Sequence, residues 1–312
     1  MRRLKLLPLV VVVCSWALAE AAQNAREKEI ADYTEAIRVA PKDATAWYRR
    51  GVAWLEKKDY DKAIADLNKA IRFAPKNALA YYKRGNAWRL KKEYDKAISD
   101  YTRAIRLDPK YANAYNNRGV TWSAKNEYDK AISDYNEVIR LDPKFAPVYS
   151  NRGEARTYKK EYDKAIDDYT QANRLDPKFQ MAYGNRAEVW ALHKKEYAKA
   201  LSDYDEAIRL DPQDAYNWNA RAWFAATCPE AKYRDGQKAV MDATKACDLT
   251  SWKDAANLDT LAAAYAEQGD FANAVKREEQ AIELASGKQK GELQSHLDLF
   301  KGHKPFRQEV KN

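Results

Sequence analysis

The chain has 312 residues, of which 32% are charged and 46% hydrophobic, and its formal net charge is +9 at pH 7. This positive excess is modest for the length, and acidic residues stand beside every basic cluster after residue 19, which argues against nucleic acid as a partner. The chain has three histidines and three cysteines, and it contains no HExxH, CxxC, glycine-rich phosphate loop or G-x-S-x-G motif, so we expect neither an enzyme nor a metal or cofactor site.

Residues 1–19 have the layout of a secretory signal peptide. The segment begins with the basic residues Arg2, Arg3 and Lys5, and an apolar run over residues 6–18 follows. Ala17 and Ala19 then form an A-x-A arrangement. We therefore expect export to the periplasm or secretion, with cleavage after Ala19 or after Ala21. Cleavage after Ala19 leaves a net charge of +6, because three basic residues and no acidic residue are removed.

Two other roles of residues 1–19 stay open. The segment can remain uncleaved as a membrane anchor that leaves the chain facing the periplasm, although its apolar run is shorter than the roughly 20 residues that a spanning helix needs. It can also be a lipoprotein signal with Cys14 as the lipidated residue. Val13 disfavours this alternative, because the position before the cysteine normally carries a small residue.

Residues 20–43 are expected to form a single cap helix. Their segment EIADYTEAIRVAP is similar to AISDYTRAIRLDP further along the chain, which belongs to the second half of a repeating unit. The first half of that unit is missing, so the mature chain is expected to begin with a half-repeat.

A period of 34 residues dominates the rest of the chain. It separates successive members of three sets: Gly51, Gly85, Gly119 and Gly153; Ala63, Ala97, Ala131 and Ala165; Pro41, Pro75, Pro109, Pro143 and Pro177. A fixed period of this length indicates one supersecondary unit copied along the chain. Such units stack through their apolar faces, so we expect a long surface for holding other molecules.

Each unit is expected to be a pair of helices. In residues 78–111, small residues and rings at helical spacing predict one helix over about 78–91 and another over about 94–107. A polar turn joins the two helices. Asp108-Pro109 ends the second one, because proline disfavours the helical conformation in the residue before it. The residues at helical spacing are Tyr81, Gly85 and Trp88, then Ala97, Ile98, Tyr101, Ala104 and Ile105.

The recurring order aromatic–x3–Gly–x2–aromatic, then Ala, Tyr, Ala and Pro, resembles the tetratricopeptide repeat (TPR). The resemblance implies an all-α fold, an α-solenoid of antiparallel helix pairs stacked in a right-handed superhelix, with the first helices lining a concave groove. Residues 285–312 are expected to form a C-terminal capping helix and tail. The repeats are expected at 44–77, 78–111, 112–145, 146–179, 180–214, 215–253 (degenerate) and 255–284.

Other residues recur with the repeat and are expected to build the scaffold. An arginine in each first helix and an aspartate in each second helix predict a ladder of ion pairs within or between neighbouring pairs. Three aromatic registers are expected to be core, such as those of Tyr81, Trp88 and Tyr94. We expect Cys228 and Cys247 to be free thiols, because they are too far apart in a regular helix pair to bridge, with Cys228 the more exposed.

Residues of the first helices that differ between repeats are the candidate binding residues, because a periodic scaffold leaves specificity to positions that vary. They are Tyr48, Val52, Leu55, Tyr82, Asn86, Arg89, Asn113, Asn116, Val120, Ser123, Ser150, Glu154, Tyr158, Met181 and Glu188. The leading hypothesis is a non-catalytic scaffold that holds a protein or peptide segment in the groove.

The alternative hypothesis is an envelope-associated scaffold that binds an acidic surface, cell-wall glycan or a membrane. It uses the lysines that recur at the turns between helices, which are Lys57, Lys58, Lys91, Lys92, Lys125, Lys159, Lys160, Lys194 and Lys195. A membrane is expected as a partner only through this basic edge or through an uncleaved signal segment.

Overall fold

The computed structural model describes residues 24–308, and this part of the chain is helical with no β-strand. The chain divides after Pro143 into two compact units, unit 1 and unit 2. The predicted signal peptide, residues 1–19, lies outside the described residues. Within them, no helix combines the length and the apolar character needed to cross a bilayer.

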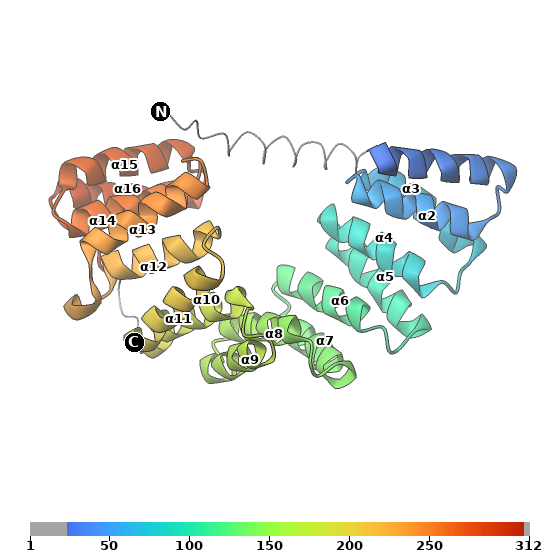
Figure 1. The fold of residues 1–312 in the computed structure, drawn as a ribbon, viewed down its shortest axis with the longest axis horizontal. Coiled ribbons are helices and arrows are strands. Elements are labelled where there is room, and N and C mark those ends of the chain that lie inside the picture. Colours follow the sequence, from blue (N-terminus) through green and yellow to red (C-terminus); the bar gives the residue numbers. More distant parts are fainter. Residues whose placement is uncertain (1–23, 309–312) are drawn as a thin grey trace, which may run out of the picture. The chain divides into compact units, whose positions relative to one another are not determined.

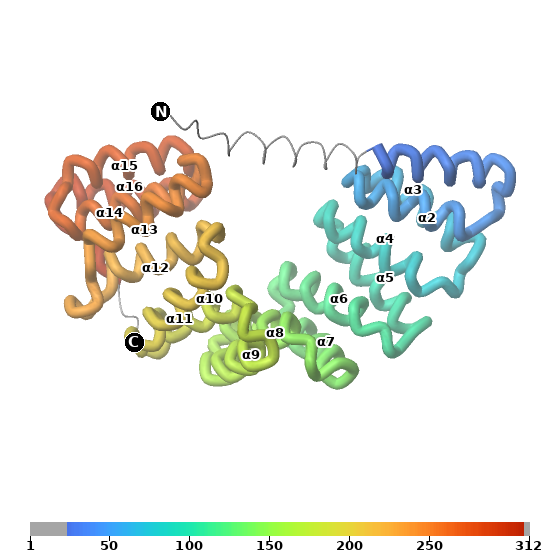
Figure 2. Tube along the Cα trace, in the orientation of Figure 1, coloured from blue at the N-terminus to red at the C-terminus, as the bar shows by residue number. Residues whose placement is uncertain are grey.

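Unit 1 contains a helix over residues 24–39 and then three helix pairs (Figure 1). Consecutive pairs pack through α3 against α4 and through α5 against α6, and the first helices α2, α4 and α6 are successive neighbours (Figure 2). The pairs are α2 (Ala44–Glu56) with α3 (Tyr60–Phe73), α4 (Ala78–Leu90) with α5 (Tyr94–Leu107), and α6 (Ala112–Ala124) with α7 (Tyr128–Leu141).

Unit 2 contains four helix pairs and a final helix, and in its last part α16 packs on α15 and α14. The all-α fold and the stacking of helix pairs are thereby confirmed. The pairs are α8 (Ala146–Tyr158) with α9 (Tyr162–Leu175), α10 (Gln180–Val189) with α11 (Tyr197–Leu210), α12 (Ala215–Thr227) with α13 (Gly236–Leu249), and α14 (Ala255–Glu267) with α15 (Phe271–Leu284), followed by α16 (Lys288–Lys301).

Each short turn within a pair is closed by one residue in the left-handed conformation. In the first pair the amide of Asp59 donates to the carbonyl of Trp54 at 3.0 Å, which satisfies a carbonyl at the end of α2. The fifth repeat has one extra residue, and a π-helical turn over Trp190–Lys194 takes it up. The residues of these turns in the left-handed conformation are Lys58, Lys92, Asn126, Lys160 and Lys195, with φ between 57° and 62°, and Gly269, with a φ of 83°.

The repeated glycine is the point where the two helices of a pair touch. A Cβ atom placed on Gly119 would lie 2.6 Å from Cε1 of Tyr135, and Gly85 and Gly153 face tyrosine rings in the same way. These three tyrosines, Tyr101, Tyr135 and Tyr169, are at most 1% exposed. Glycine therefore makes room for the largest ring of the core.

The repeated arginine and aspartate form a two-point ion pair in six helix pairs, which confirms the predicted ladder. The guanidinium donates through two nitrogens to the carboxylate at 2.6–3.2 Å, and each aspartate is only 3–7% exposed. The pairs are Arg50–Asp66, Arg84–Asp100, Arg118–Asp134, Arg152–Asp168, Arg186–Asp203 and Arg221–Asp242.

Four of these arginines, Arg84, Arg118, Arg186 and Arg221, also connect neighbouring helix pairs of the same unit. A further guanidinium nitrogen reaches back to a polar side chain in the second helix of the preceding pair, for example from Arg118 to the Thr102 hydroxyl at 2.9 Å. Arg84 reaches Asn68 at 2.6 Å, and Arg186 reaches Thr170 at 2.8 Å. One side chain thus fixes both the helix pair and its place in the stack.

Replacing Arg118 by leucine is expected to destabilise the protein strongly, because it leaves the Asp134 carboxylate buried without its cation. Breaking a buried pair from one side costs about 3–5 kcal/mol. The control is Arg140→Leu, because Arg140 pairs with Glu137 at the surface, where its side chain is 64% exposed. Thermal melting of both variants is the measurement, and equal melting temperatures would contradict a structural role for Arg118.

Replacing Gly119 by alanine is expected to destabilise by about 1–3 kcal/mol, since the added methyl group overlaps the ring of Tyr135. Gly291, in the first turns of α16, has open space around its missing side chain. Gly291→Ala is therefore the control and should stabilise by up to about 1 kcal/mol through the higher helix propensity of alanine. Chemical denaturation gives both values, and a neutral Gly119→Ala variant would show that the ring has room to move.

Candidate functional site

The first helices of each unit present a surface that we call the first-helix face, and it is described unit by unit. In unit 1 the face is formed by α2, α4 and α6, and its most prominent feature is a group of tyrosines. The ring centroid of Tyr82 lies 4.9 Å from that of Tyr111. Burial raises the pKa of Tyr111, and the neighbouring phenols of Tyr82 and Tyr48 raise it further. Burial also raises the pKa of Tyr48.

Tyr111 was missed in the sequence because it lies in the linker before α6 rather than on a first helix. A signal for it exists, since an aromatic residue stands two positions after the repeat proline at Tyr111, Phe145 and Phe179. Tyr111 is not among the predicted binding residues, because these all lie on the first helices.

An amide network crosses the face of unit 1 behind the tyrosines. The side-chain amide of Asn117 donates to the Tyr82 hydroxyl at 3.1 Å and to Oδ1 of Asn86 at 2.9 Å. The hydroxyl of buried Tyr101 donates to the same Asn86 oxygen at 2.8 Å. The Asn86 carbonyl is thus saturated, whereas its amide nitrogen has no partner among the described residues. Asn86 therefore offers hydrogen-bond donors from a fixed position.

The other predicted residues of unit 1 lie at the surface or partly below it. Val52, Leu55, Arg89 and Val120 are half-buried, and Asn113 is exposed. Two polar residues are engaged internally: the Ser123 hydroxyl lies 3.4 Å from that of Tyr135, and the Asn116 amide donates to Asn117 at 3.3 Å.

In unit 2 the first-helix face is acidic. Glu188 on α10 is half-buried and accepts a hydrogen bond of 2.5 Å from the Tyr216 hydroxyl on α12. Burial raises the pKa of Glu188, and the negative charge of Glu154 on α8 acts in the same direction. No lysine or arginine among residues 24–308 pairs with either carboxylate. This surface therefore carries uncompensated negative charge.

Large apolar groups accompany these acids. Met181 is 53% exposed, Tyr158 is 61% exposed and Tyr216 is 49% exposed. Ser150 requires a correction, because it is only 2% exposed and its hydroxyl is not part of the accessible face. The sequence predicted it at the surface from its position on the first helix alone.

Cations cover the repeated rings, which corrects the prediction that all three aromatic registers are core. Most of these rings are half-buried, because their outer faces are covered by charged side chains instead of other apolar groups. The Arg84 guanidinium lies 5.6 Å from the ring centroid of Tyr81, and the Lys96 ammonium lies 4.6 Å from that of Trp88. Such contacts between a cation and a ring are stabilising.

Four of the lysines at the turns form ion pairs within the scaffold. Lys57 pairs with Glu27 at 3.0 Å and Lys194 with Asp163 at 2.7 Å, and the ammonium groups of Lys91 and Lys125 pair with Asp61 and Asp95. Glu27 lies in the helix over residues 24–39, and the other three acids lie in the preceding helix pair. Pairing lowers the positive charge that this edge presents to an acidic partner.

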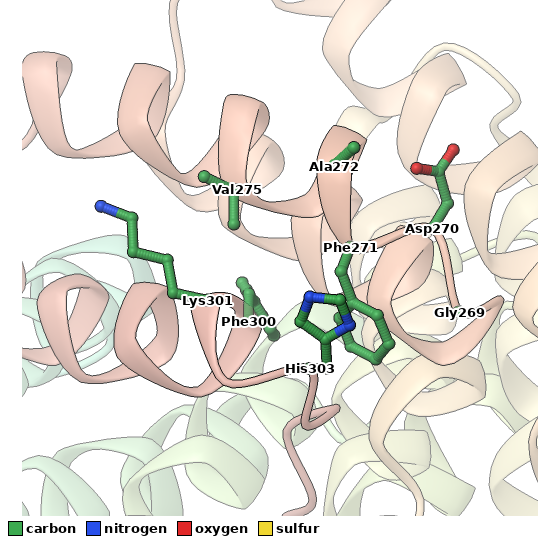
Figure 3. Close-up of a pocket in the computed structure, with 8 residues that line it drawn as sticks. All are labelled: Gly269, Asp270, Phe271, Ala272, Val275, Phe300, Lys301 and His303. Atoms are coloured by element: carbon green, nitrogen blue, oxygen red, sulfur yellow. The ribbon is translucent and has the colours of Figure 1, made fainter.

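A shallow cavity of about 500 Å³ lies in unit 2 between the start of α15 and the end of α16 (Figure 3). The His303 ring stacks on that of Phe271 with centroids 5.0 Å apart. Figure 3 shows the polar ends of Asp270 and Lys301 pointing away from each other. Binding sites for small molecules have polar groups that converge, and this cavity has none that do.

Repeated residues that build a helical scaffold, together with first helices whose surface varies, define a helical-repeat interaction protein. Models of the tetratricopeptide repeat match residues 16–78, 78–111, 112–145 and 151–215, which together exceed half of the chain. The chain belongs to the tetratricopeptide repeat family. Proteins of this family are generally non-catalytic scaffolds for protein interactions.

Solved structures share the fold at low sequence identity. Yeast Tom70 is 19% identical with a TM-score of 0.64, and the match covers 91% of this chain and 60% of Tom70. A TPR protein of Parabacteroides merdae is 17% identical with a TM-score of 0.60, covering 83% of this chain and 98% of the other. YrrB, a TPR protein with an unusual peptide-binding site, is 21% identical with a TM-score of 0.51, covering 61% and 97%. No curated protein matches the sequence significantly.

The two described cysteines are free thiols, as predicted, but the exposure predicted for Cys228 is wrong. Cys228 and Cys247 are both 0% exposed. Cys228 belongs to one buried cluster with Tyr197, Tyr204 and Phe224. The longer turn after α12 folds back over the end of that helix, because the amide of Asp235 donates to the Ala225 carbonyl at 3.0 Å and the Arg234 guanidinium donates to the Cys228 carbonyl at 2.8 Å. Burial raises the pKa of the Cys228 thiol and raises that of Cys247 to about 12.

Folded protein that lacks residues 1–19, and with them Cys14, is therefore expected to react very slowly with a thiol reagent at pH 8, because the thiolate is the reactive form and the sulfur atoms of Cys228 and Cys247 are buried. Labelling with Ellman's reagent should proceed only after unfolding in guanidinium chloride. The single variants Cys228→Ser and Cys247→Ser assign each signal. Rapid labelling of Cys228 in the folded chain would show that the turn after α12 opens.

Proposed function

We propose that the protein is a scaffold that holds segments of partner proteins on the first-helix faces of its two units. One observation carries this proposal: the residues that recur with the repeat are engaged in internal bonds, whereas several varying residues offer groups that the fold does not use. The repeated arginines and aspartates bind each other. Asn86, Glu154 and Met181 present a donor, a charge and an apolar side chain at the surface.

The two faces favour different chemistry in the partner. Unit 1 offers tyrosine rings and the amide donors of Asn86, which suit the carbonyl groups of an extended peptide. Unit 2 offers Glu154 and Glu188 beside exposed Met181 and Tyr216, which suits a segment with a lysine or arginine next to an apolar residue. Each acid gains a counter-ion in such a complex, and a charge pair in a partly desolvated site favours the correct partner.

YrrB supports peptide binding as part of the proposal only through the shared fold, since the two chains are 21% identical. The export of the chain also stays a proposal, because it depends on residues 1–19. The basic edge is a weaker candidate surface than the two faces, since lysines at four of its turns already pair with acids.

The proposal is tested by selecting binders from a random peptide library displayed on phage and measuring synthetic copies of them by fluorescence anisotropy. Peptides that bind unit 2 should be enriched in lysine or arginine. The double variant Glu154→Gln, Glu188→Gln should weaken their binding about tenfold, or ~1.4 kcal/mol, and should reduce its dependence on salt.

The matched control is Asp167→Asn, which removes an exposed acid from the second helix α9. It should leave binding unchanged. Tyr48→Ala and Asn86→Ala should weaken the peptides that depend on unit 1 and leave the basic ones unaffected. Peptides that bind all these variants equally, with the fold intact by circular dichroism, would show that the first-helix faces are not the binding site.

A further inference from the structure

The last three helices of unit 2 bring together three residues with metal-binding side chains. They are Asp259 on α14, Glu278 on α15 and His296 on α16, and one donor atom of each lies within 4.8 Å of the other two. The Nδ1 atom of His296 is 2.8 Å from Oδ1 of Asp259. The sequence did not predict this group, because Asp259 and Glu278 stand 19 residues apart and Glu278 and His296 stand 18 apart, with one residue on each helix.

Glu278 is the unusual member of the group. Glu278 is 0% exposed, and neither of its carboxyl oxygens accepts a hydrogen bond from a donor among the described residues, while the Asp259 carboxylate lies within its hydrogen-bonding reach. Glu278 is the eighth residue of its helix. The eighth position of other second helices holds an apolar side chain, as at Tyr101, Tyr135, Tyr204 and Leu67.

A buried carboxyl group with no partner is costly to the fold unless it keeps its proton or binds a cation. No lysine or arginine among residues 24–308 forms an ion pair with Glu278. The ion-pair ladder ends at Arg221–Asp242, and the corresponding position of α14 holds Leu261. Arg277, next in sequence, stacks on Trp252 and donates to Gln280. Burial, the negative charge of Asp259 and a hydrogen bond with that side chain raise the pKa of Glu278.

We propose that Asp259, Glu278 and His296 form a binding site for a divalent first-row transition metal ion such as Zn²⁺. One imidazole nitrogen with two carboxylate oxygens is a donor set that suits such ions, whereas Mg²⁺ and Ca²⁺ prefer oxygen alone. Bonds of about 2.0–2.2 Å bring neighbouring donors to roughly 3–3.5 Å from one another. The side chains therefore need to close by about 1 Å, which small torsion changes achieve.

The surroundings suit a structural ion. The ring of Phe306 lies 4.4 Å from that of His296, and the ring of Trp223 lies 6.0 Å from it, so aromatic groups shield one side of the site. Because the three ligands come from three helices, the ion ties the final helix to the last helix pair. Metal binding at such a site adds directly to the free energy of unfolding.

The first experiment uses the full chain with any affinity tag removed and metal stripped with EDTA. Calorimetric titration with ZnCl2 is expected to show one ion per chain, and Zn²⁺ should raise the melting temperature where MgCl2 does not. His296→Gln should weaken Zn²⁺ binding about a hundredfold. His193→Gln and His303→Gln are matched controls, since these are the other two histidines, and both should bind like the original chain.

A second variant keeps the test valid if ligand variants fold poorly. Glu278→Leu places at this position the residue that the first pair has at Leu67, so we expect it to fold and to be at least as stable in EDTA. Its melting temperature should not respond to Zn²⁺. The proposal is overturned if the original chain takes up no Zn²⁺, which leaves Glu278 as a buried neutral acid. It is also overturned if His296→Gln and Glu278→Leu bind Zn²⁺ unchanged, which places the ion elsewhere.

Discussion

The two-point ion pair between a first-helix arginine and a second-helix aspartate is the interaction on which the architecture depends. It recurs in six helix pairs, and its carboxylate is nearly buried each time. A buried ion pair contributes less to stability than to specificity, because desolvation offsets much of its attraction. Here it defines which residues of two helices face each other, and the further bonds of Arg84, Arg118 and Arg186 to the preceding pair define the next step of the stack within each unit.

This arrangement separates the scaffold from the surface that meets other molecules. Rings, glycines and charges that recur with the period are engaged with one another, so the varying positions change without cost to the fold. The varying positions hold tyrosines and amides in unit 1, and acids and exposed apolar groups in unit 2. Such a protein needs neither a deep cleft nor a catalytic centre to be selective, because a few well-packed side chains on a face carry most of the binding energy.

Much of the fold was predictable, because a period of 34 residues with glycine, alanine and proline in phase specifies helix pairs without any knowledge of long-range contacts. The candidate site was predictable only in part. Ser150 and Cys228 are buried and Tyr111 lies in a linker, and each depends on how turns and neighbouring helices cover a position. The group of Asp259, Glu278 and His296 was hidden for the same reason, since its members meet only when three helices pack and the local pattern around His296 contains no ligand spacing.

The turns within the pairs determine where such a chain tolerates insertions during evolution. The paired arginine and aspartate stand 16 residues apart in four pairs, 17 in the fifth and 21 in the sixth, yet the same bonds form. A π-helical turn absorbs one extra residue and a short 3-10 segment over Ala231–Tyr233 occupies the longest turn. Insertions at these points leave helix register intact, so the turns are where new loops, tags or whole domains can be accepted without rebuilding the repeat.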